Sequence, residues 1–115
     1  MTPEIFERVA AWVGSLPRVS DRIDALHLAF ENAAEWSARS RRAGDDDGAH
    51  AHESAAIGIL LALVRVAWGN PRAHIADYDG SAWAVHAGGS MWVRATEAEA
   101  LVAALENAPA DGGGR

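Results

Sequence analysis

The hydrophobic periodicity of the chain changes near Ala73, and this change restricts the fold more than any other feature. Before it, apolar residues recur every three to four positions, which predicts amphipathic helices. After it, short alternating runs are separated by glycine-containing turns, which predicts strands. Helices and strands segregated in this way are typical of an α+β fold, with helices gathered on one face of an antiparallel sheet.

Three helices are predicted before the change. The first starts at Thr2-Pro3 and ends before Pro17, and the second starts after the cap residue Ser20. A polar, flexible loop is predicted over residues 43–52. The third helix then begins at Ala49 or Ser54 and continues to Trp68. Because residues 55–64 are apolar all round, we expect this helix to be buried centrally.

A three-stranded meander and a last helix are predicted after the change. The strands cover residues 74–78, 81–86 and 91–94, and Asp79-Gly80 is a strong signal for a two-residue hairpin turn. Thr96 and Glu99 form a capping box at the start of the last helix. The predicted fold is therefore α+β, with three N-terminal helices, a three-stranded antiparallel β-meander and a C-terminal helix. We expect one compact domain over residues 1–110 and a flexible, glycine-rich tail over residues 111–115.

Composition narrows the class of protein. The 115 residues suit one domain, and a net charge of −6 disfavours general binding to nucleic acids or anionic membranes. The lack of Cys excludes disulfides and thiol chemistry. No basic segment opens the chain, and the apolar run 55–64 is shorter than a membrane span of about 20 residues. We therefore expect a soluble, cytoplasmic protein. All ten basic residues are Arg, which suggests a GC-rich bacterial or phage genome.

The turns set an expected register for the sheet. A two-residue turn at Asp79-Gly80 pairs Ala76 with Trp83, and a similar turn at Gly88-Gly89 pairs Val85 with Trp92. One face is then expected to carry His74, Ala76, Tyr78, Trp83, Val85, Trp92 and Arg94, and the other Ile75, Asp77, Ala82, Ala84, His86, Met91 and Val93. Neither face is polar, so we expect each to need a cover.

The bulky face has residue types that are enriched at protein interfaces, namely Tyr, Trp and Arg. One interpretation is a platform for a partner or for dimerisation. The competing interpretation is that the bulky face is the core and the small-residue face is exposed, or that helices cover both. Base stacking on the aromatic residues is disfavoured, because the chain from residue 44 onward carries the whole net charge of −6.

Signals for metal binding and catalysis are weak. His50 and His52 are the best candidate metal ligands, but two ligands need further histidines to converge on them. The acidic runs fail the calcium-loop pattern, which requires a bidentate Glu at its last position. A Ser/His/Asp group from Asp77, His86 and Ser90 is conceivable, although no nucleophile motif surrounds Ser90. We expect no cofactor and no catalytic activity.

The leading hypothesis is a small, acidic, non-catalytic protein-interaction module. It would act as a bacterial or phage regulator or inhibitor (anti-defence or antitoxin-like) by binding a protein with a basic surface. The candidate contact residues are Asp45, Asp46, Asp47, Asp77, Tyr78, Asp79, Trp83, Trp92 and Arg94.

Two alternatives remain open. The second hypothesis is a homodimeric scaffold, whose two-fold contact would be either the aromatic sheet face or the side of the second helix that carries Trp36. That side also carries Ala25, Ala29 and Asn32, and it suits the approach of another helix. The third hypothesis is a His-dependent metalloenzyme, which would use the His50 and His52 pair.

Overall fold

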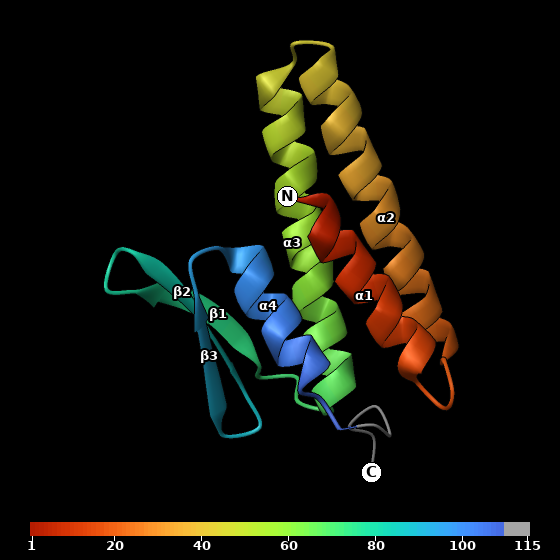
Figure 1. The fold of residues 1–115 in the computed structure, drawn as a ribbon, viewed down its shortest axis with the longest axis vertical. Helices are drawn as coiled ribbons and strands as arrows, with labels where there is room; N and C mark the ends of the chain where they lie inside the picture. The colour runs from red at the N-terminus through yellow and green to blue at the C-terminus, as the bar shows by residue number, and fades with distance from the viewer. Residues whose placement is uncertain (110–115) are drawn as a thin grey trace.

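The computed structural model describes residues 1–109, which form an α+β fold with the predicted order of elements (Figure 1). Three N-terminal helices precede a three-stranded antiparallel sheet of order β1-β2-β3 and a C-terminal helix. The tail predicted over residues 111–115 lies outside the described residues. The elements are α1 (Pro3–Ser15), α2 (Asp21–Arg42), α3 (Asp46–Trp68), β1 (His74–Tyr78), β2 (Ala82–Ala87), β3 (Ser90–Arg94) and α4 (Glu97–Glu106).

Side-chain caps explain where three of the helices start. Ser20 accepts a hydrogen bond from the backbone N–H of Ile23, and Thr96 accepts one from that of Glu99, so both predicted caps are confirmed. Asp45 accepts a hydrogen bond from the N–H of Gly48 at 2.9 Å. The loop predicted over residues 43–52 is therefore mostly wrong: α3 begins at Asp46, because Asp45 caps it and the next two carboxylates favour a helix N-terminus.

Helix α3 is less buried than its apolar sequence predicts. Its buried residues lie along one side, whereas Ala51, Ala55 and Gly58 on another side are exposed. By length and composition α3 is apolar enough to cross a membrane, although 28% of its most apolar 18-residue window is buried inside the protein. The prediction of burial all round is thus wrong, because helices cover only part of its circumference. Gly69 follows the last residue of α3 in a left-handed conformation, with φ 60°, so the helix ends where the Gly-then-Pro signal predicts.

The sheet register differs from the prediction in one of its two ladders. Val85 pairs with Trp92 and Trp83 with Arg94, as the Gly88-Gly89 turn predicts. The predicted pairing of β1 with β2 is wrong by one residue, since Tyr78 pairs with Ala82 and Asp77 with Trp83. The connecting turn holds three residues, 79–81, with left-handed φ angles of 51° and 79° at its first two positions. Longer turns of this kind are the next most common hairpin loops after the two-residue type.

The slip moves every β1 side chain to the opposite face of the sheet. The inner face, which α4 covers, carries Ile75, Asp77, Trp83, Val85, Ala87, Ser90, Trp92 and Arg94. The outer face carries His74, Ala76, Tyr78, Ala82, Ala84, His86, Met91 and Val93. Tyr78 therefore does not share a face with Trp83, Trp92 and Arg94, which corrects the predicted aromatic platform.

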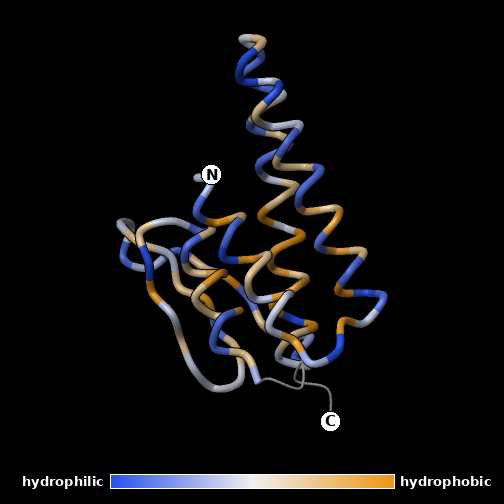
Figure 2. Tube along the Cα trace, turned by 45° about the vertical axis from the view of Figure 1, so that its right-hand side comes forward, coloured by the Kyte–Doolittle hydropathy of each residue, from blue (hydrophilic) through white to orange (hydrophobic). Residues whose placement is uncertain are grey.

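The core lies between the helices and the inner sheet face. Helix α4 is its centre: of the eight positions 98–105, all except Glu99 are buried between α1, α3 and the strands. Phe30, Leu60 and Leu101 are among the largest side chains that are fully buried. The α2 and α3 helices form a long hairpin whose distal half extends beyond the rest of the molecule (Figures 1 and 2).

Candidate functional site

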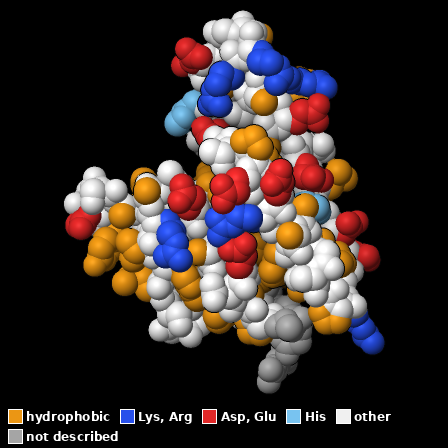
Figure 3. Space-filling view, in the orientation of Figure 1, with side chains coloured by type: hydrophobic (Ala, Val, Ile, Leu, Met, Phe, Trp, Pro, Cys, Tyr) orange, Lys and Arg blue, Asp and Glu red, His pale blue; other side chains and the backbone are white. Residues whose placement is uncertain are grey.

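The outer sheet face carries small residues between two exposed, bulky ends. Tyr78 is 44% exposed at one end and Met91 is 48% exposed at the other. Between them lie the exposed Ala76, the buried Ala84 and the half-buried Val93, which the register places in one row across the three strands. Hydrophobic side chains gather over this part of the sheet in the space-filling view (Figure 3). The face is therefore apolar without being covered by a helix.

Two histidines border the Met91 end of the outer face. His74 and His86 are directly opposite on β1 and β2, and their rings stack with centroids 4.7 Å apart. They line a shallow cavity of about 280 Å³ together with Arg72, Ser90 and the glycine turn. Asp77 lies on the inner face, so the conceivable Ser/His/Asp group of Asp77, His86 and Ser90 is not assembled.

The β1–β2 turn holds two carboxylates next to Tyr78. Asp77 accepts a hydrogen bond from the backbone N–H of Gly80 at 3.1 Å. Asp79 accepts hydrogen bonds from the backbone N–H and the hydroxyl of Ser81, the latter at 2.6 Å. Both carboxylates stabilise the turn, and both side chains remain exposed. They add negative charge to the turn beside Tyr78, with Asp77 at an inner-face position of β1 and Asp79 in the turn itself.

The two predicted contact tryptophans lie on the inner face. Trp83 and Trp92 are half-buried and pack against the core, and Trp92 meets Trp68 with ring centroids 5.3 Å apart. Trp68 is itself anchored, since its indole N–H donates to the carbonyl of Ala104 at 2.8 Å. Arg94 is exposed and donates to its neighbour's carbonyl. These tryptophans hold the sheet on α4.

The other predicted contact residues lie far from the sheet. Asp45, Asp46 and Asp47 lie at the tip of the α2–α3 hairpin, away from the sheet (Figure 1). Asp45 is occupied as the cap of α3, and the other two carboxylates lie in its first turn. The nine candidate residues therefore fall into three separate places, not one site.

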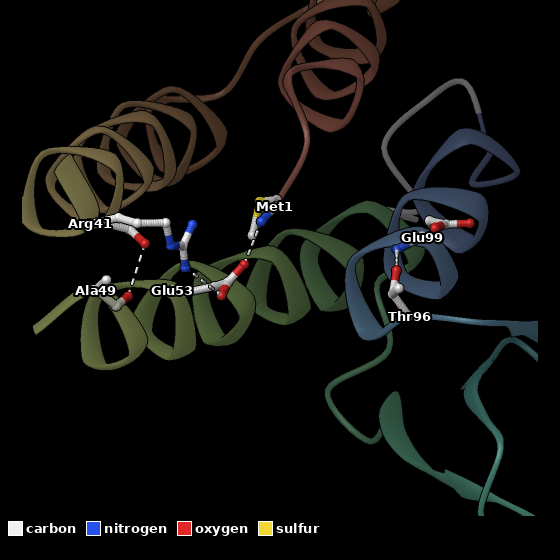
Figure 4. Close-up of polar contacts among 7 residues, drawn as sticks. Met1, Arg41, Ala49, Glu53, Thr96 and Glu99 are labelled. Atoms are coloured by element: carbon white, nitrogen blue, oxygen red, sulfur yellow. Dashed lines mark hydrogen bonds and ion pairs between the residues drawn. The ribbon is translucent and has the colours of Figure 1, made fainter. Parts of the chain in front are cut away.

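A second cavity, of about 430 Å³, lies where α1, α3 and the start of α4 meet. Glu53 lines it and accepts a hydrogen bond from the Met1 amino group at 2.5 Å, and it lies 3.6 Å from the Arg41 guanidinium (Figure 4). The Met1 amino group, followed by Arg41, lowers the pKa of Glu53, although partial burial opposes this. Thr96 and Glu99 at the opposite wall form the cap of α4. The Met1 amino group, the Glu53 carboxylate and the Thr96 hydroxyl are thus engaged in structural contacts.

The two candidate metal ligands point in different directions. His50 and His52 both lie in α3, two residues apart, which places them on nearly opposite sides of a helix. His50 lines the larger cavity, whereas His52 stacks on Trp36 of α2 with ring centroids 6.2 Å apart. Among residues 1–109, no group of three or more His, Asp or Glu side chains is arranged to hold a metal ion.

The competing interpretation of the sheet, with the bulky face as the core and the small-residue face exposed, agrees with the structure for β2 and β3. Sequence reasoning missed that Ala76 and Tyr78 belong to the outer face, because their position follows only from the β1–β2 register. Comparisons with known proteins add no function: no family model, no curated protein and no solved structure matches the chain.

Proposed function

We propose that this protein is a small, acidic, non-catalytic interaction module that binds another protein through the outer face of its sheet. The observation that supports this is the exposure of Tyr78 and Met91 on either side of an alanine floor. Exposed apolar patches with polar rims mark interaction sites in soluble proteins. Bulky side chains of a partner fit between the two ends and cover Ala76 and Val93.

The charge of the rim favours a basic partner. Asp77 and Asp79 lie beside Tyr78, and the chain as a whole carries a net charge of −6. Complementary charge accelerates association and orients the partner, and salt screens it. A partner with apolar side chains surrounded by Lys or Arg suits this end of the surface. In this proposal the protein is a regulator or inhibitor in the cytoplasm.

Capture from a bacterial lysate on immobilised protein tests the proposal. The Tyr78→Ser/Met91→Ser variant removes both ends of the outer face, and Val19→Ser is a matched control, since Val19 is 44% exposed, as Tyr78 is. We expect a protein that is captured by the wild type and the control, that is lost with the double variant, and whose capture falls at high salt.

Two results would contradict the proposal. Capture that is equal for the wild type and the double variant excludes the outer face, and capture that does not change with salt excludes the acidic rim. Circular dichroism of each variant confirms that the fold is retained, which we expect because both substituted side chains are exposed.

A further inference from the structure

The α2–α3 hairpin carries a second uncovered apolar surface. Leu28 and Trp36 of α2 are 60% and 53% exposed, more than any other large hydrophobic side chain among the described residues. His52 stacks on Trp36, so it lies on the same side, and helical spacing places further α3 residues beside it. We define the Trp36 face as Leu28, Asn32, Trp36, His52, Ala55 and Ile59.

The distal part of the hairpin stands clear of the rest of the molecule (Figures 1 and 2). Helices α1 and α4 pack against the opposite side, where Phe30 and Leu60 are buried. The Trp36 ring is already held in place, because His52 stacks on it and the Arg39 guanidinium lies 5.2 Å from its centroid. An ordered, exposed aromatic ring of this kind is typical of an interface hot spot.

The spacing of residues on α2 is complementary to itself. Leu28 and Trp36 are each four positions from Asn32, on opposite sides of it. If two α2 helices lie antiparallel with Asn32 at the crossing point, each Trp36 meets the Leu28 of the second copy. The exposed amides of the two Asn32 residues then face each other at the two-fold axis, where a polar pair fixes the register.

The charges of α2 follow the same symmetry. Its first turn holds Asp21 and Asp24, and its last turn holds Arg39, Arg41 and Arg42. In the antiparallel arrangement position 42 faces position 22 and position 39 faces position 25, so Arg42 lies one position from Asp21 and Arg39 one position from Asp24. A parallel arrangement would place like charges together, which is unfavourable. The charge pattern thus favours antiparallel over parallel packing of α2 on the α2 helix of a second copy.

We propose that the Trp36 face is a dimer interface, in which two hairpins pack into an antiparallel four-helix bundle. Helices α2 and α3 have 22 and 23 residues, so at about 1.5 Å of rise per residue one face of the pair presents on the order of 600 Å². Two copies then bury about 1,200 Å² in total, at the lower end of stable interfaces. This inference is independent of the partner surface on the sheet.

The oligomeric state gives the first test. Sedimentation across a wide concentration range is expected to show the wild type with twice the 12.2 kDa mass of one chain. Trp36→Asp and Leu28→Asp each weaken the dimer by at least about tenfold in dissociation constant. Val19→Asp, on an exposed apolar residue outside the hairpin, leaves it unchanged. A wild type that stays monomeric, or a dimer that persists in both hairpin variants, overturns the proposal.

Single cysteines test the register, because the chain has none of its own. Asn32→Cys is expected to form an intermolecular disulfide rapidly, since the two positions meet at the axis. Leu28→Cys and Trp36→Cys each cross-link poorly alone, because each lies about 12 Å along the helix from its own copy. An equal mixture of those two variants cross-links well. If Asn32→Cys reacts no faster than Val19→Cys, the antiparallel register is wrong.

Charge exchange gives the last test. Asp21→Arg and Arg42→Glu are each expected to weaken the dimer, and the double variant restores it. Failure of this rescue contradicts the antiparallel pairing of these residues.

The apolar α3 also allows membrane binding as an outcome. Flotation of the protein with phosphatidylcholine vesicles, if Trp36→Asp abolishes it, would overturn the dimer and assign the Trp36 face to a lipid surface.

Discussion

The inner and outer faces of the sheet are both apolar, but they differ in the size of their side chains. The inner face has Trp83, Val85 and Trp92, which fill the space beneath α4. The outer face has an alanine centre, which offers a helix little area to bury. Burial of apolar area stabilises a fold in proportion to that area. Helix α4 therefore packs on the bulky face, and no helix within residues 1–109 packs on the small-residue face. One sheet thus separates a face for stability from a face available for binding.

The largest expected effect comes from a pair of neighbours on β3. Trp92 points to the inner face against Trp68, and Met91 points to the exposed outer face. We expect Trp92→Ala to lower the free energy of unfolding by about 2–3 kcal/mol, because a half-buried ring is lost from the core. Met91→Ala changes it by less than about 0.5 kcal/mol. Urea denaturation measures both, and equal losses would contradict the assignment of the two faces.

The glycine turn between β2 and β3 gives the next effect. Gly88 has φ +59°, and a Cβ there would lie 2.6 Å from the Trp68 ring, which its hydrogen bond to Ala104 holds in place. Gly89 has φ +81°, with nothing within 4 Å of an added Cβ. We expect Gly88→Ala to cost about 2 kcal/mol and Gly89→Ala about 1 kcal/mol, the cost of a left-handed backbone alone. Thermal unfolding compares them, and the reverse order would place Trp68 elsewhere.

These turns also show what the sequence predicts well and what it does not. Periodicity and caps such as Ser20 and Thr96 predict the elements, because they depend on local contacts. The register of β1 was not predictable, since Asp79-Gly80 fits both a two-residue and a three-residue turn. Whether the turn includes a third residue, Ser81, decides whether Tyr78 shares a face with the tryptophans or with the outer alanines. It therefore also decides where the candidate site lies.

The exposed side of α3 was missed for a different reason. An all-apolar helix is usually central, but burial depends on how many neighbours reach it, which periodicity does not report. By contrast, the sequence distinguished the side of α2 that carries Trp36 from the main apolar stripe of the helix, because small residues lie beside that one tryptophan. The structure places Trp36 on the surface there, at 53% exposure.

The cap of α4 tests how firmly the inner face is covered. Thr96 accepts a hydrogen bond from the N–H of Glu99, whereas Thr2 at the start of α1 makes no such bond. We expect Thr96→Ala to cost about 1 kcal/mol, and Thr2→Ala close to nothing. Denaturant midpoints measured on the two variants check this. A loss at Thr2 as large as at Thr96 would mean that the cap of α4 has no special role in holding the helix.

The smallest effect is the pH dependence of the free energy of unfolding, which we expect to be the same whether or not the outer face is altered. Glu53 is paired with the Met1 amino group and Arg41, and its pKa is lowered below the ordinary 4.5. A group with a lowered folded-state pKa stabilises the fold above its unfolded value, and this contribution is lost as the pH falls through the folded-state pKa. We therefore expect Glu53→Gln to reduce stability at neutral pH, by less than about 1 kcal/mol for a partly exposed pair, and to flatten the loss below pH 4.5. Because the site lies away from the outer face, the effect should add to that of Met91→Ala within about 0.5 kcal/mol. A clear departure from additivity would mean that the outer face and the helical body are energetically coupled, contrary to the separation of roles between the two faces.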